Sequence, residues 1–254
     1  MMTPSFADLL ALVEDQSAAL REAATATALD VRVPCCPDWS LRDLVDHLGG
    51  VQRFWAAAVA AGPASGPPDD DPAGAAAPGA DLLAWSAGST AALLTALDAA
   101  GPDRGCWTWW GGSTAPMTAG AVARHQVQEA AVHARDAQDS AGRAGPLPQA
   151  VARDGVAEFV TVGLGAAGPW PDAPGRIALH GDEGDTWLVD LAETGVALAA
   201  SGAGAPSGPH PAAAVSATAS DLVLVLYRRK PLDSVRITGD RSLVERLVAW
   251  SPGD

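Results

Sequence analysis

Helical periodicity in the first 140 residues is the feature that most constrains the fold of this chain. Apolar side chains recur at helical spacing in four stretches, at about residues 5–29, 40–61, 81–100 and 118–141. Four helices with one long connection between the second and the third are typical of a helical bundle. The sequence therefore predicts a mainly α N-terminal region built as a four-helix bundle.

The second of these helices has the clearest start. Ser40 is placed to cap it, and Asp43 follows three residues later, as in a capping box. After this helix, the Pro-, Gly- and Asp-rich segment 62–80 predicts a loop. The Trp-rich stretch CWTWWGG at 106–112 connects the third helix to the fourth.

The pattern changes at AGRAGPLP, residues 141–148. A helix is expected at 148–162, and then the runs RIALHG, DTWLVDL and GVALAA predict three strands of an antiparallel sheet. A helix beginning at Ser220 or Asp221, a strand in SVRITGD and a closing helix in RSLVERLVAW complete the expected order. We therefore predict two domains, a helical bundle at 1–145 and a smaller α+β domain at 146–254.

Composition narrows the classes of partner. The formal net charge of −14 argues against nucleic acid and anionic membranes, since both require basic patches. The N-terminus lacks the features of a signal peptide, and charges, Pro or Gly interrupt every long Ala-rich run. We expect a cytoplasmic protein without a membrane partner, present as a monomer or a homodimer.

The three cysteines, Cys35, Cys36 and Cys106, are expected to be free thiols. Adjacent cysteines bridge only through a strained ring, so a redox role for Cys35 and Cys36 is not favoured. We expect that pair at an end of the bundle, and Cys106 nearest to any cleft.

Three polar residues interrupt apolar helix faces. Glu129 and His133 lie four residues apart in RHQVQEAAVHARD and share one face, while His47 interrupts a stripe between Leu44 and Val51. A buried carboxylate beside a buried imidazole is costly unless a partner such as a divalent metal satisfies both. Two His and one Glu suit a catalytic zinc with an open position.

Two structural alternatives remain open at this point. A Glu and a His four residues apart on a helix often form a hydrogen-bonded pair or a surface ion pair, and a single His in an apolar stripe is often a satisfied core residue.

Two motifs resemble the mycothiol-dependent maleylpyruvate isomerase family, CPDWSLRDLVDHL at 36–48 and ARHQVQEAAVHARDA at 123–137. The similarity extends to DLVLVLYRR at 221–229 and covers essentially the whole chain. It implies a DinB-like metal-binding bundle with a small α+β C-terminal domain. It also implies that the metal ligands are His47, Glu129 and His133, and that Arg229 occupies the family's arginine position.

The chain departs from the family pattern at three positions. His125 replaces a frequent Arg, Gln128 replaces a frequent His, and Arg228 replaces a Gly. His125 lies one turn before Glu129 and is either a fourth ligand or, as we prefer, a residue that contacts the ligands or the substrate. Asp136 either orients a ligand imidazole or pairs at the surface with Arg135 or Arg143.

The resemblance implies mycothiol as a thiol cosubstrate that a divalent metal, expected to be Zn²⁺, activates for attack on a small electrophile. Addition to an alkene, rotation and elimination would isomerise it, whereas displacement of a leaving group would give an S-conjugate. Arg229 is the candidate for binding a carboxylate of an acidic substrate and for contacting the cosubstrate, unless it belongs to a surface ion pair with its neighbours. The competing hypothesis is a non-catalytic, metal-containing module that binds small molecules.

Overall fold

A computed structural model describes residues 3–68, 81–202 and 210–251. The chain divides into two compact units. The bundle unit comprises Pro4–Trp109 and Pro116–Leu147, and the sheet unit comprises Trp110–Ala115 and the chain from Pro148 onward, with the first three residues. The chain thus passes between units at Leu147, close to the predicted boundary near residue 145, which stays a prediction.

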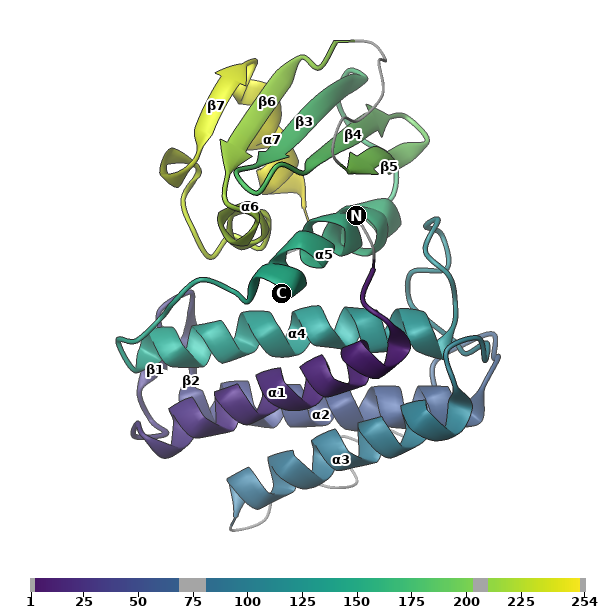
Figure 1. Cartoon of the computed structure of the whole chain (residues 1–254), viewed down its shortest axis with the longest axis vertical. Coiled ribbons are helices and arrows are strands. Elements are labelled where there is room, and N and C mark those ends of the chain that lie inside the picture. The colour runs from purple at the N-terminus through teal and green to yellow at the C-terminus, as the bar shows by residue number, and fades with distance from the viewer. Residues whose placement is uncertain (1–2, 69–80, 203–209, 252–254) are drawn as a thin grey trace. The chain divides into compact units, whose positions relative to one another are not determined.

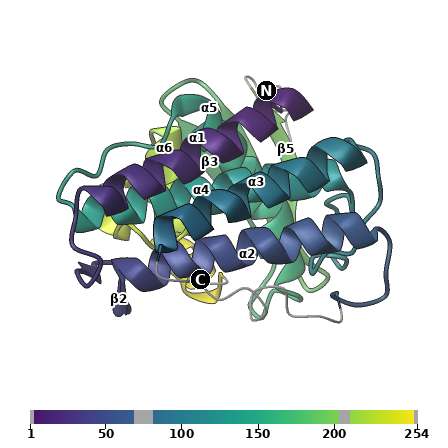
Figure 2. The same ribbon diagram turned by 90° about the horizontal axis from the view of Figure 1, so that it is seen from below.

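The bundle unit contains the four predicted helices. They run over α1 (Phe6–Thr25), α2 (Leu41–Ala61), α3 (Leu82–Ala100) and α4 (Ala119–Ser140). The helices lie side by side, with α2 packed along α3 and α1 along α4 (Figure 1, Figure 2). The helical N-terminal region is confirmed, although α1 ends earlier than the predicted residue 29.

Capping fixes where α2 begins. The Ser40 hydroxyl accepts a hydrogen bond from the Asp43 backbone N–H at 3.3 Å, and the Asp43 carboxylate accepts one from the Ser40 N–H at 2.8 Å. These reciprocal bonds satisfy two backbone donors that a helix start would leave unpaired. The predicted capping box is confirmed.

A short hairpin that the sequence analysis did not predict precedes α2. Its strands are β1 (Arg32–Val33) and β2 (Cys36–Ser40), paired antiparallel with Val33 opposite Cys36. Val33 is fully buried in the cluster that the bundle helices share, so the hairpin is anchored to the bundle core. This places Cys35 and Cys36 at the hairpin turn.

Helices α2 and α3 approach closely at a glycine. A Cβ atom on Gly49 would lie 2.1 Å from the Trp85 ring, so only glycine admits this contact. By length and composition α3 is also the one helix among the described residues able to cross a membrane, with 33% of the tested window buried. Because core helices pass the same test, this is weak evidence for a span.

The sheet unit contains a five-stranded sheet in the order β5-β4-β3-β6-β7 (Figure 1). The strands are β3 (Gly175–Gly181), β4 (Thr186–Ala192), β5 (Gly195–Gly202), β6 (Ala213–Ala217) and β7 (Arg236–Gly239). The helices are α5 (Gln149–Phe159), which continues into a π-helical turn at Val160–Leu164, α6 (Ala219–Leu226) and α7 (Arg241–Trp250), with a 3-10 turn at Leu232–Ser234. This confirms a smaller, sheet-containing C-terminal part.

The sheet differs from the prediction in one strand. Strands β3, β4 and β5 are antiparallel as expected, but β6 was not predicted, and it pairs parallel to β3. The sheet is therefore mixed. Gly239 ends β7 with a φ of 79°, and a Cβ atom there would lie 2.3 Å from the Ala212 carbonyl oxygen.

The predicted loop at 62–80 is described only in part. Residues 62–68 form no helix or strand, and residues 69–80 lie outside the described part of the chain.

Candidate metal centre

His47 from α2 and Glu129 and His133 from α4 come together inside the bundle unit. Their ligand atoms all lie within 4.8 Å of one another. The Glu129 Oε1 atom is 3.8 Å from Nε2 of His47 and 3.9 Å from Nε2 of His133. Both separations are longer than a hydrogen bond, so the three groups surround a common point without bonding directly through these atoms.

The arrangement fits a divalent cation. Ligand atoms around tetrahedral zinc lie about 3.4 Å apart when the bonds are about 2.05 Å, so binding requires the Glu129 oxygen to approach each imidazole nitrogen by roughly half an ångström. The Nε2 atom of His47 is buried and has no hydrogen-bond partner among the described residues. A cation would satisfy this nitrogen.

The charge of Glu129 is favoured even without a metal. Burial raises the pKa of this carboxyl group, but the imidazoles of His47, His133 and His125 lower it more, to about 2. Glu129 is therefore ionised at neutral pH and is ready to act as an anionic ligand.

Asp136 holds the ring of His133. The carboxylate Oδ2 lies 3.4 Å from Nδ1 of His133, on the opposite side of the imidazole from the atom that faces Glu129. Both side chains are almost completely buried. The surface ion pair with Arg135 or Arg143 is therefore excluded for Asp136, and an orienting role fits its position.

Aromatic rings border the cluster. The ring of His47 packs against Trp39, with centroids 4.8 Å apart, and edge-on against His133 at 5.1 Å. His125 lies one turn before Glu129. Its ring centroid is 6.0 Å from that of Trp55 and 5.6 Å from that of Trp109. In the described residues the ligand cluster has three members and does not include His125.

Arg229 follows α6 in the sheet unit, and its guanidinium donates to the Tyr227 carbonyl at 3.0 Å. Its neighbours also have partners: Arg228 donates to the Ser251 carbonyl, and Lys230 forms an ion pair with Asp221. The role of Arg229 stays a prediction.

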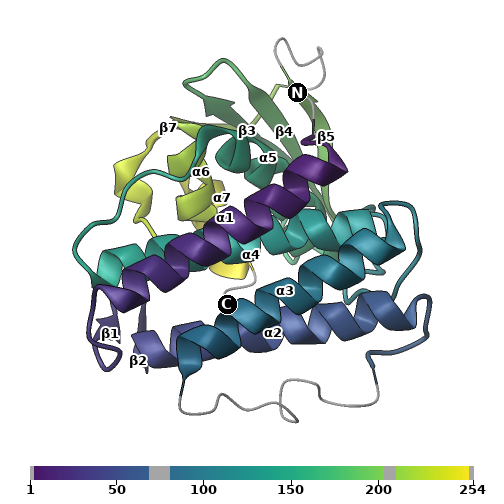
Figure 3. The same ribbon diagram turned by 60° about the horizontal axis from the view of Figure 1, so that its bottom comes forward.

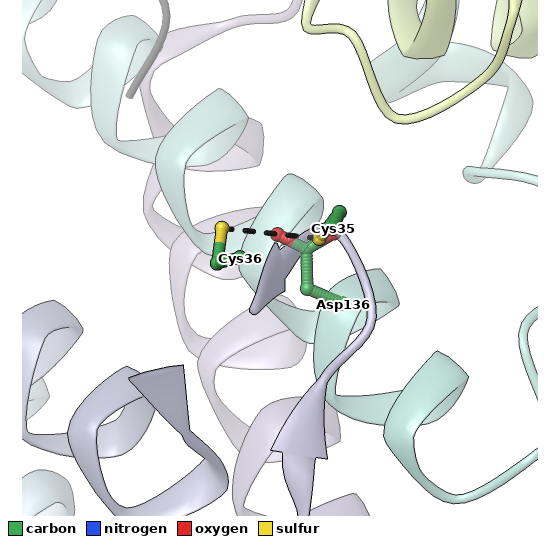
Figure 4. Close-up of side chains that lie close together, drawn as sticks. All are labelled: Cys35, Cys36 and Asp136. Atoms are coloured by element: carbon green, nitrogen blue, oxygen red, sulfur yellow. Dashed lines mark hydrogen bonds between the residues drawn. The ribbon is translucent and has the colours of Figure 1, made fainter. Parts of the chain in front are cut away.

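A second cluster was missed by the sequence analysis. Cys35, Cys36 and Asp136 place one sulfur or carboxylate atom each within 4.8 Å of the others. Figure 4 shows the cysteines of the hairpin turn on either side of the Asp136 side chain from α4. Cys106, which was expected nearest to a cleft, is buried elsewhere in the unit and belongs to neither cluster of the described residues.

The comparisons with known proteins decide the family. The profile of the mycothiol maleylpyruvate isomerase N-terminal domain matches residues 10–138, and that of the MDMPI C-terminal domain matches residues 150–246. The chain belongs to the mycothiol maleylpyruvate isomerase family. Membership confirms the resemblance seen in the sequence and the expectation that the chain is an enzyme.

Solved structures of that enzyme share the fold. A histidine-to-alanine mutant of the mycothiol-dependent maleylpyruvate isomerase aligns over 94% of this chain and 96% of its own, with a TM-score of 0.60 and 14% identity. A second structure of the isomerase aligns over the same shares, with a TM-score of 0.56 and 15% identity. At such low identity the likeness establishes the fold alone. No curated protein matches the chain significantly.

Proposed function

We propose that this chain is a cytoplasmic, mycothiol-dependent metalloenzyme that promotes attack of the mycothiol thiolate on a small electrophilic substrate. The observation that carries the proposal is the convergence of His47, Glu129 and His133 within 4.8 Å in a chain of this family. Both outcomes of the thiol attack, cis-trans isomerisation of a maleylpyruvate-type substrate and S-transfer, remain within the proposal.

The chain's own residues would prepare the metal site. His47 and His133 offer ring nitrogens, and Glu129 offers a carboxylate whose pKa is lowered to about 2. Asp136 keeps the His133 ring in place through Nδ1, which leaves Nε2 directed toward the cluster. A divalent cation held there, which we propose is Zn²⁺, would lower the pKa of a bound thiol and supply a thiolate at neutral pH.

An external thiol suits this chain better than its own cysteines. Burial raises the pKa of the Cys106 thiol and so disfavours its thiolate. Mycothiol sulfur adding to one alkene carbon turns the double bond into a single bond. After rotation about that bond, elimination restores the alkene in the other geometry and returns the thiol, so no net oxidant or proton is required.

Other residues would bind the substrate. Arg229 is proposed to bind a carboxylate of an acidic substrate through paired hydrogen bonds. His125 stands between Trp55 and Trp109 beside the metal cluster, and we propose that it contacts the electrophile.

The non-catalytic module is less well supported. A closed site with four protein ligands would favour a structural metal, whereas the cluster in the described residues has three members. Three protein ligands leave a position for an exogenous thiol.

The test is turnover by the zinc-loaded chain with mycothiol and a panel of electrophiles that includes maleylpyruvate, followed by mass spectrometry and by separation of the isomers. His47→Ala should lose most activity, while His210→Ala, at an exposed position of the sheet unit, should not. Replacing Cys35, Cys36 and Cys106 together by Ser should leave thiol-dependent turnover within roughly tenfold, or about 1.4 kcal/mol. A triple variant that binds metal normally and has no activity would contradict the external-thiol mechanism.

A further inference from the structure

We propose that Cys35, Cys36 and Asp136 form a second cation site, selective for a thiophilic divalent ion and separate from the His47 cluster. The site lies entirely in the bundle unit, between the hairpin turn and α4 (Figure 4). It requires neither the proposed reaction nor mycothiol.

The spacing of the sulfurs fits one shared ion. The Sγ atom of Cys36 donates a weak hydrogen bond to Sγ of Cys35 at 3.9 Å. Two thiolates on a tetrahedral ion with bonds of about 2.3 Å are separated by about 3.8 Å. A disulfide would instead require the sulfurs to approach to about 2.05 Å and close a strained ring. The observed spacing therefore suits metal binding without rearrangement of the turn.

Asp136 supplies the third ligand and the reason for a cation. Its side chain is fully buried, and its ligand oxygen lies within 4.8 Å of both sulfurs. Oδ2 of the same carboxylate lies 3.4 Å from Nδ1 of His133. A buried carboxylate beside two sulfurs is stabilised by a cation that all three contact.

The hairpin turn is suited to ion entry. Cys35 and Cys36 are partly exposed, whereas Asp136 lies behind them. Pro34 and Pro37 flank the pair and restrict its backbone, which reduces the conformational entropy lost on binding. Binding forms two metal–sulfur bonds and releases one proton from each thiol to solvent, with no change of oxidation state. Thiolate ligands favour soft or borderline ions such as Cd²⁺ and Zn²⁺ over Mg²⁺ or Ca²⁺.

The experiment is a titration of the reduced, metal-free full chain with Cd²⁺, followed through the ultraviolet charge-transfer band from thiolate to cadmium. The band requires sulfur, so its appearance is independent of the His47 cluster and of the proposed function. The expected result is a band that saturates by the time both clusters are filled, at no more than about two equivalents per chain, unchanged in Cys106→Ser and absent in the Cys35→Ser, Cys36→Ser double variant. Asp136→Asn should keep the band and weaken cadmium binding at least about tenfold.

A measurement on the unsubstituted protein tests the site even if the cysteine variants fail to fold. The ¹¹³Cd resonance of the parent chain should include a signal in the range of two-sulfur coordination, in addition to any signal from a nitrogen and oxygen site. Absence of that signal overturns the proposal, as does a charge-transfer band that survives the double replacement or disappears in Cys106→Ser. Cadmium binding by Asp136→Asn as tight as that of the parent would remove Asp136 from the site.

Discussion

Glu129 is the proposed anionic ligand of the candidate metal centre, and its replacement by the isosteric Gln tests the assignment. Glu129→Gln removes the charge and preserves the volume, so two neutral imidazoles would face the cation without a carboxylate. We expect the zinc content of the chain to fall by about one equivalent, since loss of a ligand leaves an incomplete site. Elemental analysis measures this, with Glu193→Gln at an exposed turn as the matched control. Full zinc content in Glu129→Gln would exclude the residue as a ligand.

Arg229 makes a different contribution, which should appear in substrate binding rather than in metal content. Arg229→Ala removes a guanidinium able to form two charge-assisted hydrogen bonds, each worth roughly 1.5–3 kcal/mol. We expect KM for an acidic substrate to rise at least about tenfold, since one such bond corresponds to a factor of ten or more. The zinc content should not change. Arg236→Ala, at an exposed position of β7, is the control, and an unchanged KM in Arg229→Ala would contradict the assignment.

The sequence allowed some of the clustered residues to be predicted but not others, and the difference has a physical reason. His47, Glu129 and His133 were predictable because each interrupts an apolar helix face, and such an interruption is visible locally. The contact of Cys35 and Cys36 with Asp136 joins a turn to a distant helix. Sequence periodicity gives no sign of a contact between a turn and a distant helix. From the sequence alone, a surface ion pair was an equally good interpretation of Asp136, which the structure shows to be fully buried.

At the scale of elements, the start of α2 depends on its capping box. The Ser40 side chain, followed by its backbone N–H, holds the pKa of the Asp43 carboxyl below the ordinary 3.8. A carboxyl group with a lowered folded-state pKa contributes stability above its unfolded-state pKa. That contribution is lost as the pH falls through the folded-state value.

Ser40→Ala should therefore raise the pKa of Asp43 toward 3.8 and destabilise the protein by about 1 kcal/mol at neutral pH, the usual effect of removing such a cap. The pH titration of the Asp43 carboxyl carbon by NMR and chemical denaturation measure the two effects. Ser242→Ala, in the first turn of α7, is the comparison, and an unchanged pKa in Ser40→Ala would show that the reciprocal bond does not form in solution.

The elements that escaped prediction are those whose side chains carry little pattern. Strand β6, AAVSA, is made mostly of alanines, which favour helix over strand, so its sequence does not indicate a strand. The hairpin before α2 has one strand of two residues and carries Pro37 in the other. The hairpin forms because Val33 packs in the bundle core. This is a tertiary contact, so it cannot be predicted from the local strand propensities of the residues.

At the scale of the whole molecule, the two compact units should respond differently to metal. A bound metal ion stabilises only the part of the protein that unfolds together with the metal site. All three residues that would hold the ion belong to the bundle unit. Zinc should therefore slow amide hydrogen exchange in α2 and α4 around these residues, while β4 and β5 exchange at unchanged rates. Exchange measured by mass spectrometry with and without zinc decides this, and equal slowing in both units would show that they open as one.

The order of the units along the chain has a consequence for biosynthesis. Helices α1 to α4, seen together in Figure 3, and all residues of both clusters precede the first strand of the sheet. Strand β3 cannot pair with its parallel partner β6 until β4 and β5 have been synthesised. Since domains fold largely as units during translation, the bundle can assemble on the ribosome while the sheet still lacks its central pairing. A nascent chain would thus have the three candidate ligands close together before the sheet unit is complete.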